Sequence, residues 1–360
     1  MTNFEPLIRG FLVEGSKVCL IGSEKDIHLN TVFKGEITNL TYDPFRGIIG
    51  YIKKNYRFNV LRIGHNIDVN LVFKYYYGLI EDNGIIIIDN SSGFDRTLME
   101  TCLGKFKLIY DSSEKLVLQK EPLKSDITFA IVIPTYYRKN GKTNGYIKRS
   151  LTSIQNQSYQ NYKVFLMGDR YENKKEYESY RELLPEGKME MVNLPIAFER
   201  DNCKTRENLW RVGGANAVNE GMNLAQKQSF KYYLHLDDDD YWHSFHLRNI
   251  AQAYEQFPEA VFVTTLGYCT NFGILPKTDV LDYNNFVCAG KQAYHSSYGF
   301  RLDMISFRYV TIDPKDPDKL CPMADADMLD RIGILCQWKG WKYLAVTLLT
   351  CLHDTEGELG

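Results

Sequence analysis

The chain has 360 residues and lacks the marks of several protein classes. Its eight cysteines form no Cys-x-x-Cys pair, which argues against a zinc knuckle, and scattered thiols in a chain of this size are typical of a reducing compartment. Residues 1–10 show no basic segment followed by an apolar core, and no run of about 18 apolar residues occurs. We therefore expect a cytoplasmic protein with no signal peptide and no membrane span.

Strong charge of one sign is also missing. The formal net charge is −2, so no whole-chain attraction to nucleic acid is expected and nucleic acid is not a predicted partner. No internal repeat or low-complexity tract is evident. Hydrophobic residues make up 44% of the chain and charged residues 24%, both ordinary for a globular protein. The length suits two domains.

A polar, proline-containing segment at residues 121–126 separates two series of strands and helices. We predict an α/β domain at residues 1–122 and a second α/β domain at 127–360. In the second, apolar runs predict strands at 129–134, 163–169, 189–194, 231–236 and 260–265, with helices between them. Such alternation predicts a mostly parallel sheet covered by helices on both faces.

The first series predicts a small sheet with strands at 17–22, 59–64 and 84–89 and an antiparallel pair at 107–110 and 116–118. Residues 79–90 resemble the latter half of a class I methyltransferase. That family has a glycine-rich loop after its first strand, whereas residues 22–25 contain one glycine. We therefore expect a non-catalytic Rossmann-like domain that serves as a scaffold, with a surface for a protein partner or a homo-oligomer.

Four consecutive aspartates, Asp237 to Asp240, follow the apolar run at residues 232–236. Neighbouring carboxylates repel one another, so such a cluster is costly unless a cation or hydrogen-bond donors offset it. Ligand sites in open α/β sheets lie at the carboxyl ends of strands, and carboxylates suit Mg²⁺ or Mn²⁺. The run predicts a divalent-metal site for a phosphorylated ligand. The alternative is a solvated loop or the first turn of a helix.

Over residues 129–354 the second series resembles a GT-A glycosyltransferase of the inverting family 2. The matching motifs are VIPTYYR at 132–138, LMGD at 166–169, RVGGANAVNEG at 211–221 and LDDDDYWH at 236–243. The resemblance implies a GT-A fold and a nucleotide-sugar pocket, with Asp169 at a uracil-like base. The residues implied in nucleotide-sugar binding are Pro134, Thr135, Tyr136, Arg138, Asp169, Arg211, Asn219, Asp237 and Asp238.

The same resemblance implies the metal ligands and the catalytic base. Asp239 would bind Mn²⁺ or Mg²⁺, Asp237 would contact the ribose or the metal's water, and His353 would complete the metal shell. The segment at 323–331 is similar to the family's Glu-Asp-x-x-Leu-x-x-Arg pattern, which makes Asp325 the base. Because the family's Glu is an alanine here, Asp327 is the alternative base. Asp240 is expected to cap the following helix.

The predicted function is transfer of a sugar, with inversion, from a nucleotide-diphosphate donor to a hydroxyl acceptor. A UDP-sugar is favoured as donor, and a glycan or glycoconjugate is the expected acceptor. Two alternatives remain open at this point. One is a catalytically silent nucleotide-sugar-binding scaffold, and the other is a bifunctional methyltransferase–glycosyltransferase.

Overall fold

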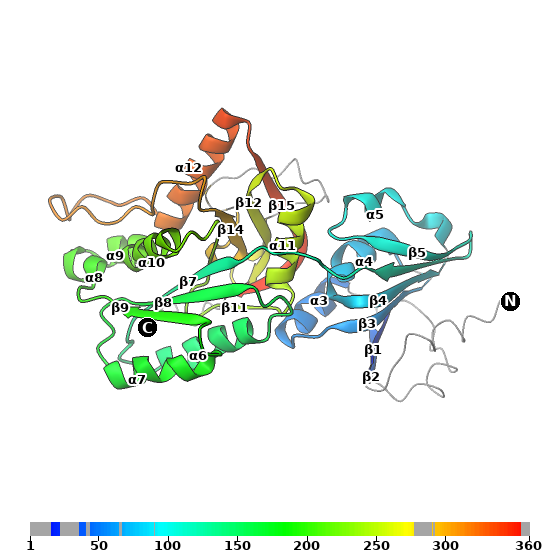
Figure 1. The fold of residues 1–360 in the computed structure, drawn as a ribbon, viewed down its shortest axis with the longest axis horizontal. Helices are drawn as coiled ribbons and strands as arrows, with labels where there is room; N and C mark the ends of the chain where they lie inside the picture. The colour runs from blue at the N-terminus through cyan, green and yellow to red at the C-terminus, as the bar shows by residue number, and fades with distance from the viewer. Residues whose placement is uncertain are drawn as a thin grey trace. The chain divides into compact units, whose positions relative to one another are not determined.

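A computed structural model describes residues 16–21, 36–40, 44–64, 67–89, 91–276, 290 and 292–353. The chain divides into two compact units, Met1–Lys124 with Thr347–Leu349, and Ser125–Val346 with Thr350–Gly360. Each unit contains its own sheet (Figure 1). Among the described residues, no helix combines the length and apolarity that a membrane crossing needs.

The first sheet has six strands in the order β2-β1-β3-β4-β6-β5. Strands β2, β1, β3 and β4 are parallel, whereas β6 runs antiparallel to both β4 and β5. The predicted antiparallel pair is thus confirmed, while β2 was not predicted. The strands are β1 Lys17–Ile21, β2 Glu36–Leu40, β3 Phe58–Ile63, β4 Ile80–Asp89, β5 Phe106–Asp111 and β6 Lys115–Lys120.

The helices described in this unit are α3 Pro44–Lys53, α4 Val69–Tyr76 and α5 Thr97–Thr101. Two 3-10 turns, η1 Tyr77–Leu79 and η2 Ser91–Gly93, flank β4. The Asp68 side chain accepts from the Leu71 N–H at 3.0 Å and so caps α4. Residues 22–25, on which the glycine-loop argument depends, lie outside the described residues. The methyltransferase resemblance and the non-catalytic role of this unit stay predictions.

The second sheet has nine strands, in the order β11-β15-β12-β14-β10-β7-β8-β9 with β13 beside β12. The strands are β7 Phe129–Thr135, β8 Tyr162–Gly168, β9 Met189–Asn193, β10 Tyr232–His235, β11 Tyr241–Trp242, β12 Ala260–Cys269, β13 Gly273–Leu275, β14 Tyr298–Arg301 and β15 Lys342–His353. Strands β10, β7, β8 and β9 are parallel, as the sequence predicts.

The expectation of a mostly parallel sheet is wrong beyond β10. Strand β12 runs in the same direction as β10 but does not pair with it, because β14 inserts between them and pairs antiparallel with both. A Cβ at Gly299 would lie 2.5 Å from the Tyr233 carbonyl oxygen, so only glycine fits at this position of β14. The result is a mixed sheet.

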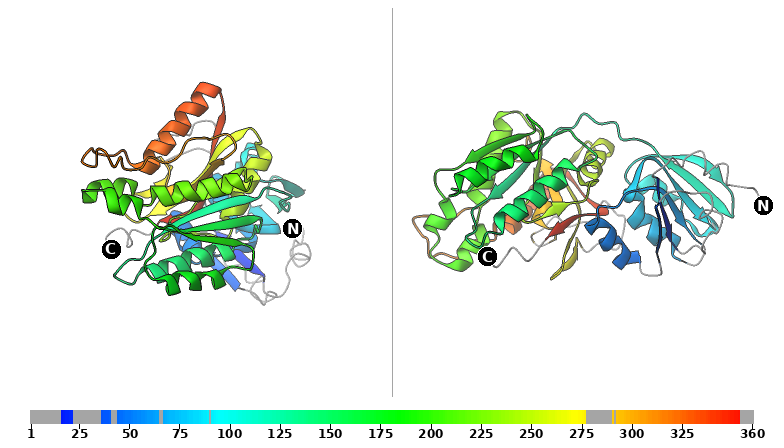
Figure 2. Two further views of the ribbon diagram at one scale, coloured as in Figure 1. Left: turned by 60° about the vertical axis from the view of Figure 1, so that its left-hand side comes forward. Right: turned by 90° about the horizontal axis from the view of Figure 1, so that it is seen from below.

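Helices cover both faces of the parallel strands. Helix α10 lies on β7 and β8, while α6 and α7 lie on the opposite face (Figures 1 and 2). The helices of this unit are α6 Thr143–Gln155, α7 Lys174–Ser179, α8 Phe198–Asn202, α9 Arg206–Val212, α10 Ala215–Lys227, α11 His246–Gln256 and α12 Ala324–Lys339. The 3-10 turns η3 Tyr180–Leu183 and η4 His295–Ser297 complete it.

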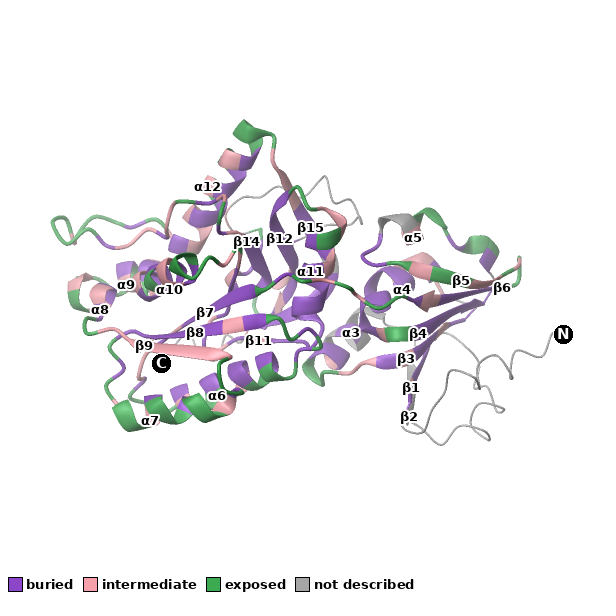
Figure 3. Cartoon of the chain, viewed as in Figure 1, coloured by how far each residue is buried: buried purple, intermediate pink, exposed green. Residues whose placement is uncertain are grey.

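The core of this unit lies between α10 and the central strands, which are buried almost throughout, whereas edge strand β9 is half-buried (Figure 3). Helix α10 approaches β7 very closely, because a Cβ at Gly221 would lie 2.5 Å from Cγ1 of Val132. Gly214 has φ +78°, the left-handed conformation that glycine adopts without strain, and it turns the chain from α9 into α10. This packing holds the carboxyl ends of β7, β8 and β10 at one edge.

Candidate active site

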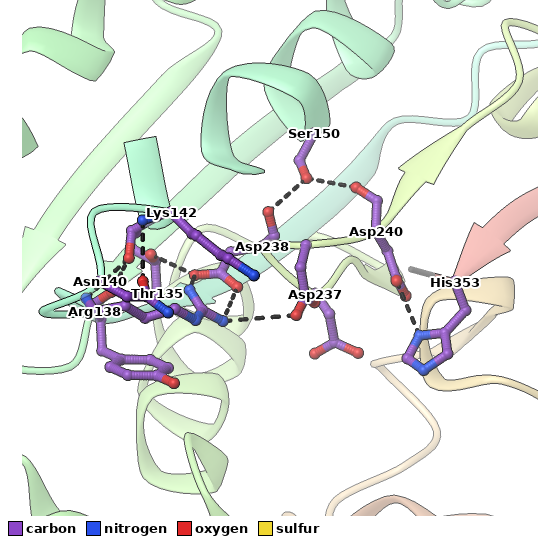
Figure 4. Close-up of polar contacts among 12 residues, drawn as sticks. Thr135, Arg138, Asn140, Lys142, Ser150, Asp237, Asp238, Asp240 and His353 are labelled. Carbon is purple, nitrogen blue, oxygen red and sulfur yellow. Dashed lines mark hydrogen bonds and ion pairs between the residues drawn. The ribbon is translucent and has the colours of Figure 1, made fainter. Parts of the chain in front are cut away.

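The acidic run follows β10 after one residue, and its carboxylates differ in their surroundings. Figure 4 shows those of Asp237, Asp238 and Asp240. Asp238 is held by Arg138 in a bidentate ion pair, in which Nη1 and Nη2 each lie 2.7 Å from a carboxylate oxygen. The Thr135 hydroxyl donates to the same carboxylate at 2.7 Å. Arg138 and Asp238 are both buried. The guanidinium group of Arg138, a residue implied in nucleotide-sugar binding, is thus occupied by an aspartate of the chain.

Asp240 links the acidic run to the end of β15. Its Oδ1 lies 2.9 Å from Nδ1 of His353, and its backbone carbonyl accepts from the Ser150 hydroxyl at 2.5 Å (Figure 4). The expectation that Asp240 caps the next helix is wrong. Helix α11 starts after Phe245 with no side-chain cap, because Asp240 is buried and directed to the histidine instead.

Asp237 has the most exposed side chain of the four aspartates, at 32%, and it lines a cavity. Its Oδ1 lies 2.8 Å from Nε2 of His235, and its backbone N–H donates to the Ser296 hydroxyl at 3.0 Å. Burial alone would raise the pKa of this carboxyl, but His235, His295 and His353 together hold it well below its usual range. Asp237 is therefore an anion presented to the cavity.

Asp239 is the aspartate whose ionised form is most disfavoured by the cluster. Burial, together with the charges of Asp238, Asp240 and Asp237, raises its pKa well above the usual value, although Nη2 of Arg138 lies 3.7 Å away. The Arg149 guanidinium donates to its backbone carbonyl. The repulsion between such closely packed carboxylates decreases when one of them binds a proton or when a cation binds between them. The buried pair with Arg138 offsets only part of the negative charge.

A cavity of about 670 Å³ opens beside the acidic run. The side chains around it come from β10, α9, α10, α12, β13 and the ends of β7 and β15. Among the residues predicted from the sequence, it is lined by Pro134, Arg211, Asp237, Asp325 and His353. Its volume is in the range of small-molecule sites. The fold therefore brings the strand-end aspartate and the first turn of α12 to one cavity.

The two predicted base candidates are separated by the structure. Asp325 lines the cavity, and burial raises the pKa of its carboxyl, with Asp237 adding to the rise. Asp327 is not in the cavity lining, because its carboxylate pairs with Arg331 on the next turn at 2.6 Å. A raised pKa in a cavity is what a general base near neutral pH requires. Of the two, only Asp325 has this environment.

Asp169, at the end of β8, has a buried environment that the sequence did not disclose. Arg200 of α8 donates from Nε to Oδ2 at 2.9 Å, while the buried Oδ1 has no hydrogen-bond partner. Burial raises the pKa of this carboxyl although Arg200 opposes it. The Tyr136 ring lies 4.3 Å from the Arg138 guanidinium and 5.3 Å from that of Arg200. This buried oxygen is an acceptor that lacks a donor, and an N–H group would satisfy it.

Two other predicted residues, Asn219 and Arg211, form contacts within the protein. The Asn219 side chain exchanges two hydrogen bonds with the Tyr309 backbone, at 2.8 and 2.9 Å, and thereby fixes the loop that follows β14. Arg211 pairs with Glu207 at 2.9 Å but also lines the cavity. At the start of α10, the Asn216 N–H donates to Glu199 at 2.8 Å. A carboxylate of the chain thus occupies one backbone donor at the N-terminus of α10.

The residues that could hold a divalent cation include two that sequence reasoning missed. His235, Asp237 and His295 each offer one ligand atom, all within 4.8 Å of one another. The two imidazole rings stack, with centroids 3.4 Å apart, and burial lowers the pKa of His295 well below its usual value, so this ring is neutral. The predicted ligand Asp239 is absent from the cavity lining, whereas Asp237 and His353 are both in it. Carboxylate and neutral imidazole groups fit a divalent ion such as Mn²⁺.

Known proteins similar to this chain are glycosyltransferases. The model of the family "Glycosyl transferase family 2" matches residues 130–294, a range that contains β7, the acidic run and Tyr294. An uncharacterized glycosyltransferase of Acanthamoeba polyphaga mimivirus is 37% identical over 243 residues, which cover 65% of this chain and 97% of that protein.

Solved structures that match part of the chain include S. aureus TarS 1-349 in complex with UDP-GlcNAc, at 15% identity and a TM-score of 0.44, over 64% of this chain and 59% of that one. A second is the mannosyltransferase PcManGT from Pyrobaculum calidifontis in complex with GDP-Man and Mn²⁺, at 14% identity and a TM-score of 0.41, over 64% and 60%. The chain thus spans about three fifths of each solved chain. From the family match and the viral relative, we conclude that the chain is a glycosyltransferase of family 2, with the GT-A fold of that family.

Proposed function

We propose that this protein transfers a sugar, with inversion and with the help of a divalent cation, from a UDP-sugar to a hydroxyl group of an acceptor. The observation that carries the proposal is the position of Asp325 and Asp237 in the lining of one cavity. One carboxyl has a raised pKa and the other a lowered pKa. Two carboxyl groups whose environments separate their pKa values take different roles in acid–base chemistry.

Asp325 acts as the general base. It accepts the proton of the acceptor hydroxyl while that oxygen forms a bond to the anomeric carbon of the donor sugar. The bond between the anomeric carbon and the diphosphate oxygen breaks, and its electron pair leaves with the diphosphate. Because attack and departure occur on opposite faces, the configuration inverts. Base catalysis of this kind contributes about 10²- to 10⁴-fold in rate.

Asp237 and His353, with His235 and His295 behind Asp237, would hold the cation. When bound, the cation neutralises the charge that develops on the leaving diphosphate. Asp240 keeps the imidazole of His353 in place through the contact at 2.9 Å. The Oδ1 of Asp169, which has no hydrogen-bond donor in the protein, is suited to accept from the N–H of a uracil ring, and this favours a UDP-sugar as donor.

The base assignment has a matched pair of variants. Asp325→Asn is expected to reduce turnover by about 10²-fold or more while donor binding persists, because the amide cannot take the proton. Asp327→Asn, two residues along the same helix but paired with Arg331 outside the cavity, is expected to keep near-normal turnover. UDP release with Mn²⁺ measures turnover, calorimetry with UDP measures donor binding, and NMR of the product gives the anomeric configuration. If Asp325→Asn turns over normally, Asp325 is not the base; a retained configuration would exclude inversion.

A further inference from the structure

Two large aromatic side chains at the cavity are left in contact with solvent. Trp210 is 60% exposed and Phe272 is 64% exposed, and both line the cavity that contains Asp237 and Asp325. Trp338, on the later turns of α12, is 75% exposed but is not in the cavity lining. Exposed aromatic surface contributes nothing to the core, so its place beside the candidate catalytic groups calls for a ligand.

The two rings belong to different walls of the cavity. Trp210 lies on α9, which is fastened to the segment before α12, since the Asn208 side chain accepts from the Cys321 N–H at 2.9 Å and donates to the Lys319 carbonyl at 2.9 Å. Phe272 lies in the turn between β12 and β13.

The turn that contains Phe272 contacts the part of the cavity wall that includes Tyr294 and His353. The Tyr294 hydroxyl donates to the Gly273 carbonyl at 2.9 Å, and the Tyr294 ring stacks on His353 at 5.5 Å. One aromatic ring thus stands on the side of the base Asp325 and the other on the side of His353.

The cavity combines these rings with polar groups, which restricts the ligand. A pyranose ring has C–H groups on its faces, which pack on aromatic rings, and hydroxyl groups at its edge, which need hydrogen-bond partners. Arg211 and Asp325 in the same lining supply such partners. A lipid chain would bury these polar groups without compensation. The donor base is not a competitor for the rings, because Asp169 is not in the cavity lining.

We propose that Trp210 and Phe272 form an acceptor subsite that binds a pyranose ring, so that the acceptor of this enzyme is a saccharide. This inference rests on the proposed function, because a sugar held there presents its hydroxyl groups to Asp325. It assigns the acceptor class and leaves the donor to the groups around Asp169.

The test compares four forms of the 360-residue chain: wild type, Trp210→Ala, Phe272→Ala and Trp338→Ala. In the first assay, binding of each form to a broad array of glycans is measured in the presence of Mn²⁺ and UDP. In the second, quenching of tryptophan fluorescence by acrylamide is measured with and without lactose, cellobiose or decyl phosphate, because a bound ligand shields the ring from the quencher. We expect wild type and Trp338→Ala to bind the same glycans, and Trp210→Ala and Phe272→Ala each to lose about five- to tenfold in affinity, as for one lost aromatic contact. Trp210→Phe, which retains a ring, is expected to recover most of the binding.

Each outcome has a distinct meaning. The subsite is disproved if Trp210→Ala and Phe272→Ala bind glycans as Trp338→Ala does, if wild type binds none, or if only decyl phosphate protects the fluorescence. Failure of the proposed function shows separately, as absence of UDP release by wild type from any UDP-sugar in the presence of Mn²⁺. Circular dichroism of every variant confirms that a loss of binding is not a loss of folding.

Discussion

Arg138 and Asp238 hold each other in a buried bidentate ion pair, with both guanidinium–carboxylate distances at 2.7 Å. The pair ties the end of β7 to the acidic run after β10, and the Thr135 hydroxyl adds a third contact at 2.7 Å. A family resemblance alone assigned both residues to the donor. The structure shows that their contacts also fix the position of the neighbouring carboxylates, while their role in donor binding stays a prediction.

We expect Asp238→Ala to lower the free energy of unfolding by about 3–5 kcal/mol, because it leaves the Arg138 guanidinium buried without its main partner. Urea denaturation measures the change. Arg181→Ala, which removes an exposed ion pair with Glu178, is the control and should remain close to wild type. Equal stability of the two variants would show that the buried pair contributes no more than a surface pair.

Asp240→Asn is expected to weaken Mn²⁺ binding by about 10- to 100-fold, because groups that orient a metal ligand typically affect affinity by this factor. The variant keeps the shape of the side chain but removes the charge 2.9 Å from Nδ1 of His353. Calorimetric titration of Mn²⁺ in the presence of UDP gives the affinity. Asp303→Asn, in a pair with Arg301 away from the cavity, is the control. An unchanged affinity in Asp240→Asn would remove His353 from the metal shell.

Gly221→Ala should destabilise the protein by about 1–3 kcal/mol, the usual cost of overpacking. The added methyl group would lie 2.5 Å from Cγ1 of Val132, so α10 or β7 must move. Val132→Ala in the same chain removes that atom and should recover part of the loss. Gly145→Ala in α6 is the matched control, since nothing lies within 4 Å of its Cβ position and the change should add about 0.5–1 kcal/mol. Thermal and urea unfolding that rank the two alanines alike would contradict the close approach of α10.

Glu199 gives a pH dependence of stability. Burial raises its pKa from 4.5 to about 7, against the hydrogen bond from the Asn216 N–H. The folded protein then holds a proton that the unfolded chain has lost, so this group's contribution is fully present below pH 4.5 and declines as the pH rises to about 7.

Because Glu199→Gln does not titrate, its stability relative to wild type should increase by ~3 kcal/mol between pH 4 and pH 8. Urea denaturation of both proteins at several pH values measures this difference. A difference that stays constant across the range would mean that Glu199 is ionised in the folded protein at pH 4 as readily as in the unfolded chain.

The elements that the sequence predicts well have their cause within a short stretch of chain. Ile147, Leu151 and Ile154 recur at helical spacing and are all fully buried on α6, and the apolar run at 129–133 is fully buried in β7. Strand β14 could not be predicted in this way, because it has four residues, one of them Gly299. It becomes a strand only through pairing with β10 and β12, from distant parts of the chain.

The candidate site shows the same division. Motif order identified Asp237 and Asp325, which line the cavity together. It could not show that Arg138 pairs with Asp238, because an arginine and an aspartate at these motif positions could equally well contact a ligand. His235 was hidden within an apolar strand and His295 in a long connection without periodicity. The polar residue inside the apolar run at 232–236 was the only signal for His235, and His295 had none.

The tie between Asp240 and His353 has a consequence for the order in which the protein becomes functional. Strand β15 ends at His353, the last residue that the structure describes, and it pairs with β11 directly behind the acidic run. A ribosome-bound chain that ends before this strand contains the donor wall, the acidic run and Asp325, yet it lacks one side of the cavity. The proposed transfer therefore depends on β15 being synthesised and paired with β11, because His353 and its contact with Asp240 exist only then.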